Sequence, residues 1–242
     1  MKAQGNVQPG PSAFVEIALV TGGATRLGAH SSRRLAQAGY GVVVHHHDST
    51  PEVVDEIRAA GGNAWALAAD LCDAKQAASL VAMAEQLAGA EVTVVVNNAA
   101  SYPKADFAGA SWDDLSAVVA LNVWAPWAIM RCIRRGVVVN ILDARLADVD
   151  ATHVPYLVGK AALAHLTAVA ARVMAPFVRI NAVSPGRIEF PDDKSSLQEK
   201  MLLHRLPTAD EVAEAVYFLV SSPSITGETI HVDGGRHLGA TK

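Results

Sequence analysis

The sequence predicts an α/β fold in which a doubly wound parallel sheet of seven strands is flanked by helices. Short apolar runs alternate with helical patterns through the 242 residues. Most of these runs are hydrophobic at consecutive positions, as in parallel strands that are buried on both faces. A glycine-rich turn joins the first run to the first helix, which is typical of a Rossmann-like arrangement.

The apolar runs mark the strands, and the stretches between them have helical periodicity. The predicted strands are Val15–Val20, Gly41–His45, Ala64–Ala68, Val92–Asn97, Val137–Ile141, Val178–Val183 and Thr229–Val232. The predicted helices are Leu27–Ala38, Pro51–Ala60, Asp73–Ala88, Trp112–Arg135, Tyr156–Met174 and Ala209–Ser221. We expect the Trp112–Arg135 stretch to form two helices, broken near Asn122. No repeat or linker divides the chain, so residues 1–242 are predicted to form one domain.

Composition narrows the class of protein. With 242 residues, of which 51% are hydrophobic, the chain is long enough for one large α/β domain and short for two. The net charge of −4 gives no reason to expect nucleic acid or an anionic membrane surface as a partner. A small-molecule substrate is expected instead.

The cysteines and the hydropathy pattern predict the cellular compartment of the protein. Cys72 and Cys132 have the spacing of neither a disulfide framework nor a metal site, which fits a reducing cytoplasm. No apolar run is expected to reach membrane-spanning length. Residues Met1–Pro11 are polar and lack the apolar core of a signal peptide, so they are predicted to form a loose tail.

The first strand leads into the segment Thr21-Gly-Gly-Ala-Thr-Arg-Leu-Gly28 and then into a helix. Gly22 allows a tight turn, and Gly28 lets the helix pack close to the sheet. The N–H groups at the start of that helix are free to bind a diphosphate, so the segment predicts a dinucleotide site. A glycine-rich loop without a ligand is the alternative. The residues expected to contact the cofactor here are Gly22, Thr25, Arg26, Leu27 and Gly28.

The end of the second strand predicts which dinucleotide binds. An NAD site usually has an acidic side chain at this tip, and His46 takes its place here. Arg26, His47 and Ser49 are expected to hold a 2′-phosphate, which favours NADPH, although the Asp48 carboxylate would repel that group. Neighbouring histidines on a strand point to opposite faces, so no metal site is predicted.

Tyr156 and Lys160 are four residues apart and lie on the same face of a predicted helix. A lysine ammonium beside a phenol favours the phenolate, which would lower the pKa of Tyr156 and make it a usable proton donor. An amphipathic helix with a solvent-directed lysine is the alternative. Asp143 lies thirteen residues before the tyrosine.

Seven segments together resemble the short-chain dehydrogenase/reductase family over nearly the whole chain. They are Thr21–Gly28, Asp70-Leu71, Asn97-Asn-Ala-Ala100, Asn122, Tyr156-x-x-x-Lys160, Asn181-Ala-Val-Ser-Pro-Gly186 and Val232-Asp-Gly-Gly235. Arg26 replaces a glycine of the usual loop, Asp143 replaces the usual catalytic serine, and the chain continues to Gly235-Arg-His-Leu238. These features are similar to pteridine reductases and to dihydromonapterin and dihydrofolate reductases of the short-chain type. The resemblance implies NADPH-dependent reduction of a dihydropterin.

The resemblance also implies roles for individual residues. Tyr156 would be the general acid, Lys160 would lower its pKa and bond the nicotinamide ribose, and both would contact the cofactor. Asn122 would hold a water that links Lys160 to solvent, with a plain helix-kink amide as the alternative. An ionised Asp143 cannot donate a hydrogen bond to a ketone, but it can relay a proton to a pterin nitrogen. A strand-end aspartate that caps a turn is the alternative for Asp143.

The remaining site residues follow from the same resemblance. Tyr102 would stack on the flat ring of the substrate, unless it only packs against the substrate loop. Asp70 would bond the adenine amino group. The other expected cofactor contacts are Leu71, Asn98, Ala99, Pro185 and Gly186. Arg187 begins the segment Arg187–Leu203, which is predicted to be a mobile lid over the substrate.

Two further expectations concern assembly and the remaining histidines. The family is mostly tetrameric, and the Tyr156 helix has apolar, mostly small residues suited to a subunit contact, namely Leu157, Ala161, Ala164, Leu166 and Ala168. A homotetramer is therefore expected, with a dimer as the fallback because the segment Val123–Gly136 is short. The histidines expected to be structural or solvated are His153, His165, His204, His231 and His237.

Two alternatives to the main functional hypothesis stay open. One is an NADPH-dependent reductase of another carbonyl or imine that uses the same tyrosine. The other is a non-catalytic dinucleotide sensor, which would need neither the tyrosine nor the lysine.

Overall fold

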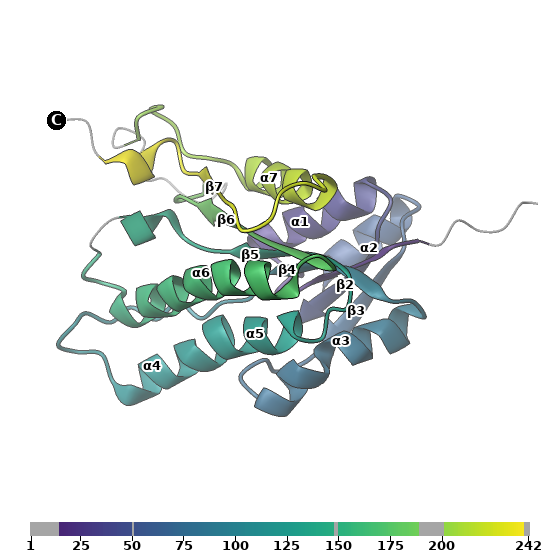
Figure 1. Cartoon of the computed structure of the whole chain (residues 1–242), viewed down its shortest axis with the longest axis horizontal. Coiled ribbons are helices and arrows are strands. Elements are labelled where there is room, and N and C mark those ends of the chain that lie inside the picture. The colour runs from purple at the N-terminus through teal and green to yellow at the C-terminus, as the bar shows by residue number, and fades with distance from the viewer. Residues whose placement is uncertain (1–14, 50, 148–149, 189–200, 240–242) are drawn as a thin grey trace, which may run out of the picture.

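The computed structural model describes residues 15–49, 51–147, 150–188 and 201–239, so the predicted N-terminal tail lies outside the described residues. Seven parallel strands form one sheet in the order β3-β2-β1-β4-β5-β6-β7 (Figure 1). The strands are β1 (Ile17–Val20), β2 (Gly41–His46), β3 (Ala64–Ala68), β4 (Val92–Asn97), β5 (Gly136–Ile141), β6 (Val178–Pro185) and β7 (Thr229–Val232). The predicted doubly wound sheet is confirmed, and strand order reverses between β1 and β4.

Helices cover both faces of the sheet. They are α1 (Arg26–Gln37), α2 (Glu52–Ala59), α3 (Ala74–Ala88), α4 (Trp112–Val118), α5 (Ala125–Met130), α6 (Val154–Met174) and α7 (Ala209–Ser221), with short 3₁₀ turns η2 (Ala144–Ala147) and η4 (Arg236–Leu238). One apolar core lies between the sheet and α1, α2 and α7, and a second lies between the sheet and α3, α5 and α6 (Figure 1). The carboxyl ends of the strands therefore open onto one edge, where α/β sheets bind ligands.

The predicted division into two helices near Asn122 is confirmed, although the chain stays helical between them. A π-helical segment, η1 (Val119–Trp124), connects α4 to α5, and the residues at both junctions keep right-handed helical dihedrals. Helix α6 packs tightly on this segment because it carries a glycine there. A Cβ on Gly159 would lie 2.5 Å from Val118 Cγ1. The helical run ends at Met130 rather than at Arg135, so α5 is short and a turn leads directly into β5.

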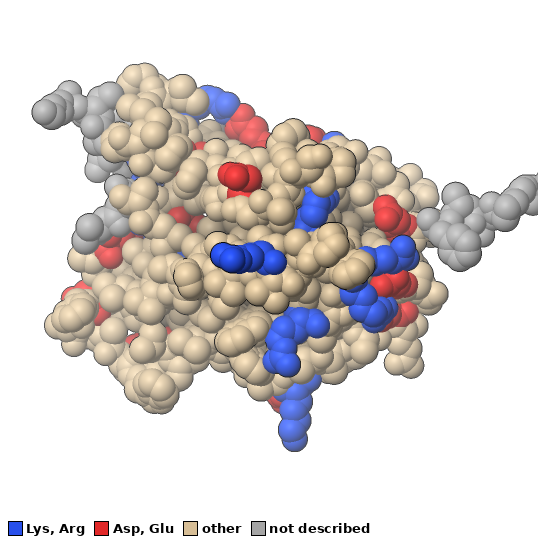
Figure 2. Space-filling view, in the orientation of Figure 1, with Lys and Arg blue, Asp and Glu red and all other residues tan. Residues whose placement is uncertain are grey.

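Helix α6 corrects the expectation that no apolar run reaches membrane-spanning length. Among the described helices it is long and apolar enough by length and composition, with a mean hydropathy of 1.3, although only 28% of that window is buried. Its inner face, which includes Leu163 and Ala171, packs on the sheet. Its outer face exposes Val158, Val169 and Val173. Figure 2 shows few charged side chains over this part of the molecule. The apolar composition of α6 thus reflects an exposed face as well as a buried one.

Candidate active site

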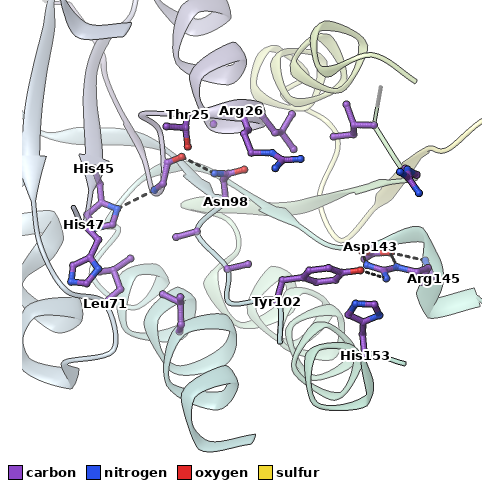
Figure 3. A pocket seen from close by; sticks show the side chains of 18 of the residues that line it. Thr25, Arg26, His45, His47, Leu71, Asn98, Tyr102, Asp143, Arg145 and His153 are labelled. Carbon is purple, nitrogen blue, oxygen red and sulfur yellow. Dashed lines mark hydrogen bonds and ion pairs between the residues drawn. The ribbon is translucent and has the colours of Figure 1, made fainter. Parts of the chain in front are cut away.

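A cavity of about 1200 Å³ lies at the carboxyl ends of the strands (Figure 3). Its walls include many of the residues predicted for the site: Gly22, Thr25, Arg26, Leu27, Gly28, His47, Asp70, Leu71, Asn98, Ala99, Tyr102, Asp143, Gly186 and Arg187. The predicted residues that do not line it are His46, Ser49, Asn122, Tyr156, Lys160 and Pro185. The predicted lid lies mostly outside the described residues, since 189–200 are not described.

The loop after β1 is tied to the end of β4 by hydrogen bonds. Thr21 Oγ1 accepts from the Asn98 and Ala99 N–H groups at 2.9 and 3.0 Å, and Asn98 Nδ2 donates to the carbonyls of Thr21 and Gly22 at 2.9 and 3.0 Å. Gly28 is required by close packing, because a Cβ there would lie 2.0 Å from the Gly22 carbonyl oxygen. These hydrogen bonds and the close packing at Gly28 therefore hold the loop in place.

The N-terminus of α1 meets the cavity at this loop. Its N-cap Thr25 makes no side-chain capping hydrogen bond, and the first turn carries no acidic residue. Exposed backbone N–H groups and the positive end of the helix dipole suit a diphosphate. The cavity and the loop thus fit a dinucleotide.

His45 holds this loop and was missed by the sequence analysis. The Gly22 N–H donates to His45 Nδ1 at 3.0 Å, and His45 Nε2 lies 3.1 Å from the Ala69 carbonyl oxygen. Because Nδ1 accepts, Nε2 carries the proton and the ring is neutral. Burial lowers the pKa of His45 to about 4.

The assignment of His46 to the cofactor site is wrong by one position. His45 and His47 line the cavity, whereas His46 does not, and its buried Nδ1 has no hydrogen-bond partner among the described residues. Side chains alternate between the two faces of a strand, so the sequence already indicates that His45 and His47 share one face.

The predicted 2′-phosphate cluster is not assembled in this conformation. His47 pairs with the adjacent Asp48 at 3.1 Å. Figure 3 shows Arg26 pointing into the pocket toward its Asp143 end, away from His47. Joint binding of a phosphate by Arg26 and His47 therefore stays a prediction.

The expected adenine contacts occupy the turn after β3. Asp70 Oδ1 accepts from the Cys72 N–H at 2.8 Å, and the Asp70 N–H donates to Gln76 Oε1 at 2.9 Å. Leu71 is buried beside them in the cavity wall. This turn gives the end of the pocket an apolar surface next to a fixed carboxylate, which suits an amino-substituted aromatic ring.

At the other end of the cavity, Asp143 lines the wall and Tyr156 lies buried behind it. The Tyr156 hydroxyl donates to Asp143 Oδ2 at 2.9 Å. Burial, and then the negative charge of Asp143, raise the pKa of Tyr156 well above its usual value. The expected lowering by Lys160 is therefore wrong for this state.

Lys160 lies too far from the phenol to reverse that effect. Its Nζ is 5.7 Å from the centre of the Tyr156 ring and donates instead to the Ile141 carbonyl oxygen at 2.6 Å. Burial lowers the pKa of Lys160 to about 8, and the nearby Asp143 charge opposes this only in part.

Arg145 is the main residue that the sequence analysis did not identify. Its Nε donates to Asp143 Oδ1 at 3.0 Å and its Nη2 donates to Asp143 Oδ2 at 2.8 Å. Burial alone would raise the pKa of Asp143, but the Arg145 guanidinium outweighs it and holds the pKa below its usual value. Asp143 is therefore ionised at neutral pH. The available signal was an arginine two residues after the aspartate, on the turn that follows a strand.

An aromatic wall adjoins this ion pair. Tyr102 stacks on His153, with ring centres 4.3 Å apart and an interplanar angle of 16°, and it meets the edge of Tyr156 at 4.7 Å. Arg145 Nη1 donates to the Tyr102 hydroxyl and, at 3.1 Å, to Asp150 Oδ2. The expectation that His153 is merely structural or solvated is therefore wrong, since it forms part of the pocket wall.

Asn122 has a clear structural contact. Its Oδ1 accepts from the Ser101 N–H at 2.8 Å, and its Nδ2 donates to the Ser101 carbonyl oxygen at 2.9 Å. The side chain thus ties the π segment to the loop that carries Tyr102. Its proposed contact with a water remains a prediction.

A second cluster lies outside this pocket, where the sequence analysis expected unpartnered histidines. His231 and His237 stack with ring centres 4.0 Å apart, and His237 Nδ1 lies 2.9 Å from Asp233 Oδ2. Their nitrogens, with an Asp233 oxygen, lie within 4.8 Å of one another. The rings are within 13° of parallel, so their in-plane lone pairs do not converge on one ion in this arrangement.

Comparison with known proteins agrees with this geometry. Residues 22–237 match the family model described as enoyl-(acyl carrier protein) reductase. The chain is 34% identical to a granaticin polyketide synthase putative ketoacyl reductase 2 from Streptomyces violaceoruber, over 92% of this chain and 96% of that protein. It is 30% identical to a 3-oxoacyl-[acyl-carrier-protein] reductase from Staphylococcus aureus, over 91% and 98% of the two chains.

The similar solved structures include dihydrofolate reductases. A FolM alternative dihydrofolate reductase 1 from Brucella canis, complexed with NADP, superposes with a TM-score of 0.87 at 30% identity, covering 94% of this chain and 96% of that one. The corresponding protein from Brucella suis, also with NADP, gives 0.86 at 29% identity, covering 93% and 96%. Sequence relatives thus include ketoacyl reductases, and structural neighbours include dihydrofolate reductases.

Proposed function

The chain belongs to the short-chain dehydrogenase/reductase family, and from that premise we propose that it is an NADPH-dependent reductase of a dihydropterin. Dihydromonapterin, dihydrobiopterin and dihydrofolate are the candidate substrates. Asp143 carries the proposal, because an ionised carboxylate anchored by Arg145 occupies the place of a hydroxyl donor.

Reduction of a ketone and reduction of a pterin place different chemical demands on Asp143. A ketone becomes an alkoxide during reduction, and a carboxylate beside it would repel the developing negative charge and offer no hydrogen bond. A pterin ring nitrogen gains a proton during reduction, and a carboxylate beside it favours that protonation. An anchored, ionised Asp143 therefore supports the pterin class.

NADPH fits the cofactor end of the cavity. The α1 N-terminus and the Gly22–Gly28 loop would hold its diphosphate, while Arg26, His47 and Ser49 are proposed for the 2′-phosphate and Asp70 for the adenine. Lys160 is proposed to bond the nicotinamide ribose. The bound cofactor supplies a hydride to the substrate carbon next to the protonated nitrogen.

Residues of the chain would supply and transfer the proton. Tyr156 keeps its hydroxyl proton at neutral pH and directs it toward Asp143 Oδ2. We propose that, as hydride reaches the adjacent carbon and makes the ring nitrogen basic, this proton passes from the Tyr156 hydroxyl to Asp143 Oδ2 and on to the nitrogen. Solvent then returns a proton to Tyr156, so that Asp143 is again ionised after each turnover. Tyr102 and His153 form a flat wall beside the pair, which suits an aromatic bicyclic substrate.

The test is an NADPH-oxidation assay with a panel of dihydropterins and a panel of ketones and quinones. The wild type should reduce at least one dihydropterin. Asp143→Ser should lower that rate roughly 10²–10⁴-fold, which is typical for the loss of a general acid–base group. The same change restores a hydroxyl donor, so any weak rate on an activated ketone should hold or rise. Parallel falls in both rates, or no dihydropterin reduction by the wild type, would reject the pterin proposal.

A second candidate function is reduction of another carbonyl or imine with NADPH. The ketoacyl reductases among the sequence relatives favour it, and the same assay panels decide between the two. A non-catalytic dinucleotide sensor is the remaining alternative, and nucleotide binding without turnover on any panel member would support it.

We also propose that the protein is a cytoplasmic homotetramer, with a dimer as the fallback. The exposed apolar face of α6, which includes Ala161, Ala168 and Val169, supports a subunit contact. Light scattering at micromolar concentration tests this, and a monomer mass would reject it.

A further inference from the structure

We propose that Arg145 is a positioning residue that keeps Asp143 ionised and aimed at the Tyr156 hydroxyl, and that it couples this pair to the aromatic wall through Tyr102. This inference concerns the same site as the proposed function. Only its turnover measurements rest on that function; the pKa measurement on Asp143 does not. Asp143 and Tyr156 hold the proton, and Arg145 acts through them.

The contacts of Arg145 are distributed in a way that fixes Asp143. Its backbone N–H donates to Asp143 Oδ1 at 2.9 Å, in addition to the two bonds from its guanidinium. With the Tyr156 hydroxyl, the carboxylate accepts four hydrogen bonds. The 3₁₀ turn η2 directly after β5 brings the arginine back onto the aspartate. Both side chains are largely shielded, at 16% and 15% exposure.

The other edge of the guanidinium extends away from Asp143. Nη1 donates to Asp150 Oδ2 and to the Tyr102 hydroxyl, and the guanidinium carbon lies 4.9 Å from the centre of the Tyr102 ring. A single planar group therefore connects the proton-holding pair with the stacking surface. Movement of Tyr102 against a substrate ring would act directly on the ion pair.

Charged and titratable groups surround Asp143 from several elements. They are Arg145 on η2, Tyr156 and Lys160 on α6, Asp150 and His153 before α6, and Tyr102 after β4. Arg26, Arg187 and Arg236 line the same cavity. Among these groups, Arg145 is the cation shown in direct contact with Asp143, so removing it leaves a buried carboxylate without its main counter-charge.

The experiment compares Arg145→Gln with Arg145→Lys and with Arg33→Gln. The last is the matched control, because Arg33 makes a single surface ion pair with Glu56 away from the cavity. The pKa of Asp143 is read by carbon-13 NMR of labelled aspartate, with Asp143→Asn for assignment, and the pH profile of kcat/KM is recorded on whichever substrate turns over. Arg145→Gln should raise the pKa of Asp143 and move the acidic limb upward, by about 1–3 pH units.

Arg145→Lys should raise the pKa of Asp143 by less than Arg145→Gln does, since lysine keeps the positive charge but cannot form the bidentate hydrogen bond. Tyr102→Phe should raise KM and shift the pKa of Asp143 less than Arg145→Gln does, because it removes only the contact on the other edge of the guanidinium. If Arg145→Gln does not fold, as judged by thermal unfolding, the lysine variant decides. An unchanged pKa of Asp143 in the folded variants would overturn the inference. A shifted pKa without dihydropterin turnover in the wild type would leave it standing and reject the proposed function.

Discussion

The two ends of the pocket are built by different means. At the cofactor end, backbone amides, glycines and one neutral histidine, His45, hold the phosphate loop in place. At the substrate end, the walls are charged side chains that hold one another, with Asp143, Arg145 and Asp150 in one network. Backbone contacts depend on close packing, whereas side-chain networks depend on charge state. The cofactor end should therefore respond mainly to changes in volume, and the substrate end mainly to changes in charge.

The largest effect expected at the cofactor end comes from one methyl group. Gly28→Ala places a Cβ 2.0 Å from the Gly22 carbonyl oxygen, so the loop must move away from the helix N-terminus. We expect no measurable NADPH binding by fluorescence titration. Gly109→Ala is the control, because its Cβ would meet only the side chain of Asp106 at 3.1 Å. Normal NADPH binding by Gly28→Ala would show that the loop is not held by packing.

The largest effect at the substrate end should be chemical rather than steric. Tyr156→Phe removes the hydroxyl that donates to Asp143 and should lower turnover roughly 10²–10⁴-fold while leaving NADPH affinity nearly unchanged. Lys160→Ala should lower both, because Lys160 is also proposed to hold the ribose. Stopped-flow turnover and equilibrium titration separate these outcomes. Full activity in Tyr156→Phe would make Asp143 or water the proton donor.

A pH dependence is expected at the cofactor end, through His45. Its folded pKa of about 4 lies below the usual 6.5, so the unfolded chain binds the extra proton between these values. Stability should therefore fall as pH falls through this window, by roughly 2 kcal/mol between pH 7 and pH 5. Urea unfolding of the wild type and of His45→Gln measures this. The variant should lack that share of the pH dependence, and identical slopes would contradict the role given to His45.

The smallest expected effect concerns choice of cofactor. We expect NADPH to bind at least tenfold more tightly than NADH, which corresponds to about 1.4 kcal/mol. Arg26 and His47 are proposed to face the 2′-phosphate, while Asp48 opposes it. Titration of both cofactors against the wild type and Arg26→Gln checks this. Equal affinities in the wild type would mean that Asp48 cancels the arginine.

Sequence reasoning performed differently at the two ends, for a physical reason. The strands and the phosphate loop follow from local signals, namely apolar runs and glycines at fixed spacing, and the structure places the predicted loop residues in the cavity wall. His46 was misassigned because the sequence does not show which face of β2 turns toward the cavity. That choice is set by tertiary contacts rather than by neighbouring residues.

The substrate end depends on contacts that no local pattern encodes. Tyr102 and His153 are far apart in sequence and stack only because separate loops meet over Asp143. The pKa of Tyr156 depends first on how deeply the hydroxyl is buried and then on the charge of Asp143. The spacing of Tyr156 and Lys160 could not reveal that Lys160 bonds the Ile141 carbonyl instead.

The reversal of strand order between β1 and β4 also constrains how the chain is made. Thr21 bonds the Val96 carbonyl across a separation of 75 residues, and the phosphate loop is secured by Asn98 beyond it. A nascent chain that stops short of β4 would expose one apolar edge of β1, with nothing to close the loop. Cofactor binding therefore becomes available to stabilise the protein only after the middle of the sheet has formed. Until then, the exposed edge of β1 is open to pairing with another molecule.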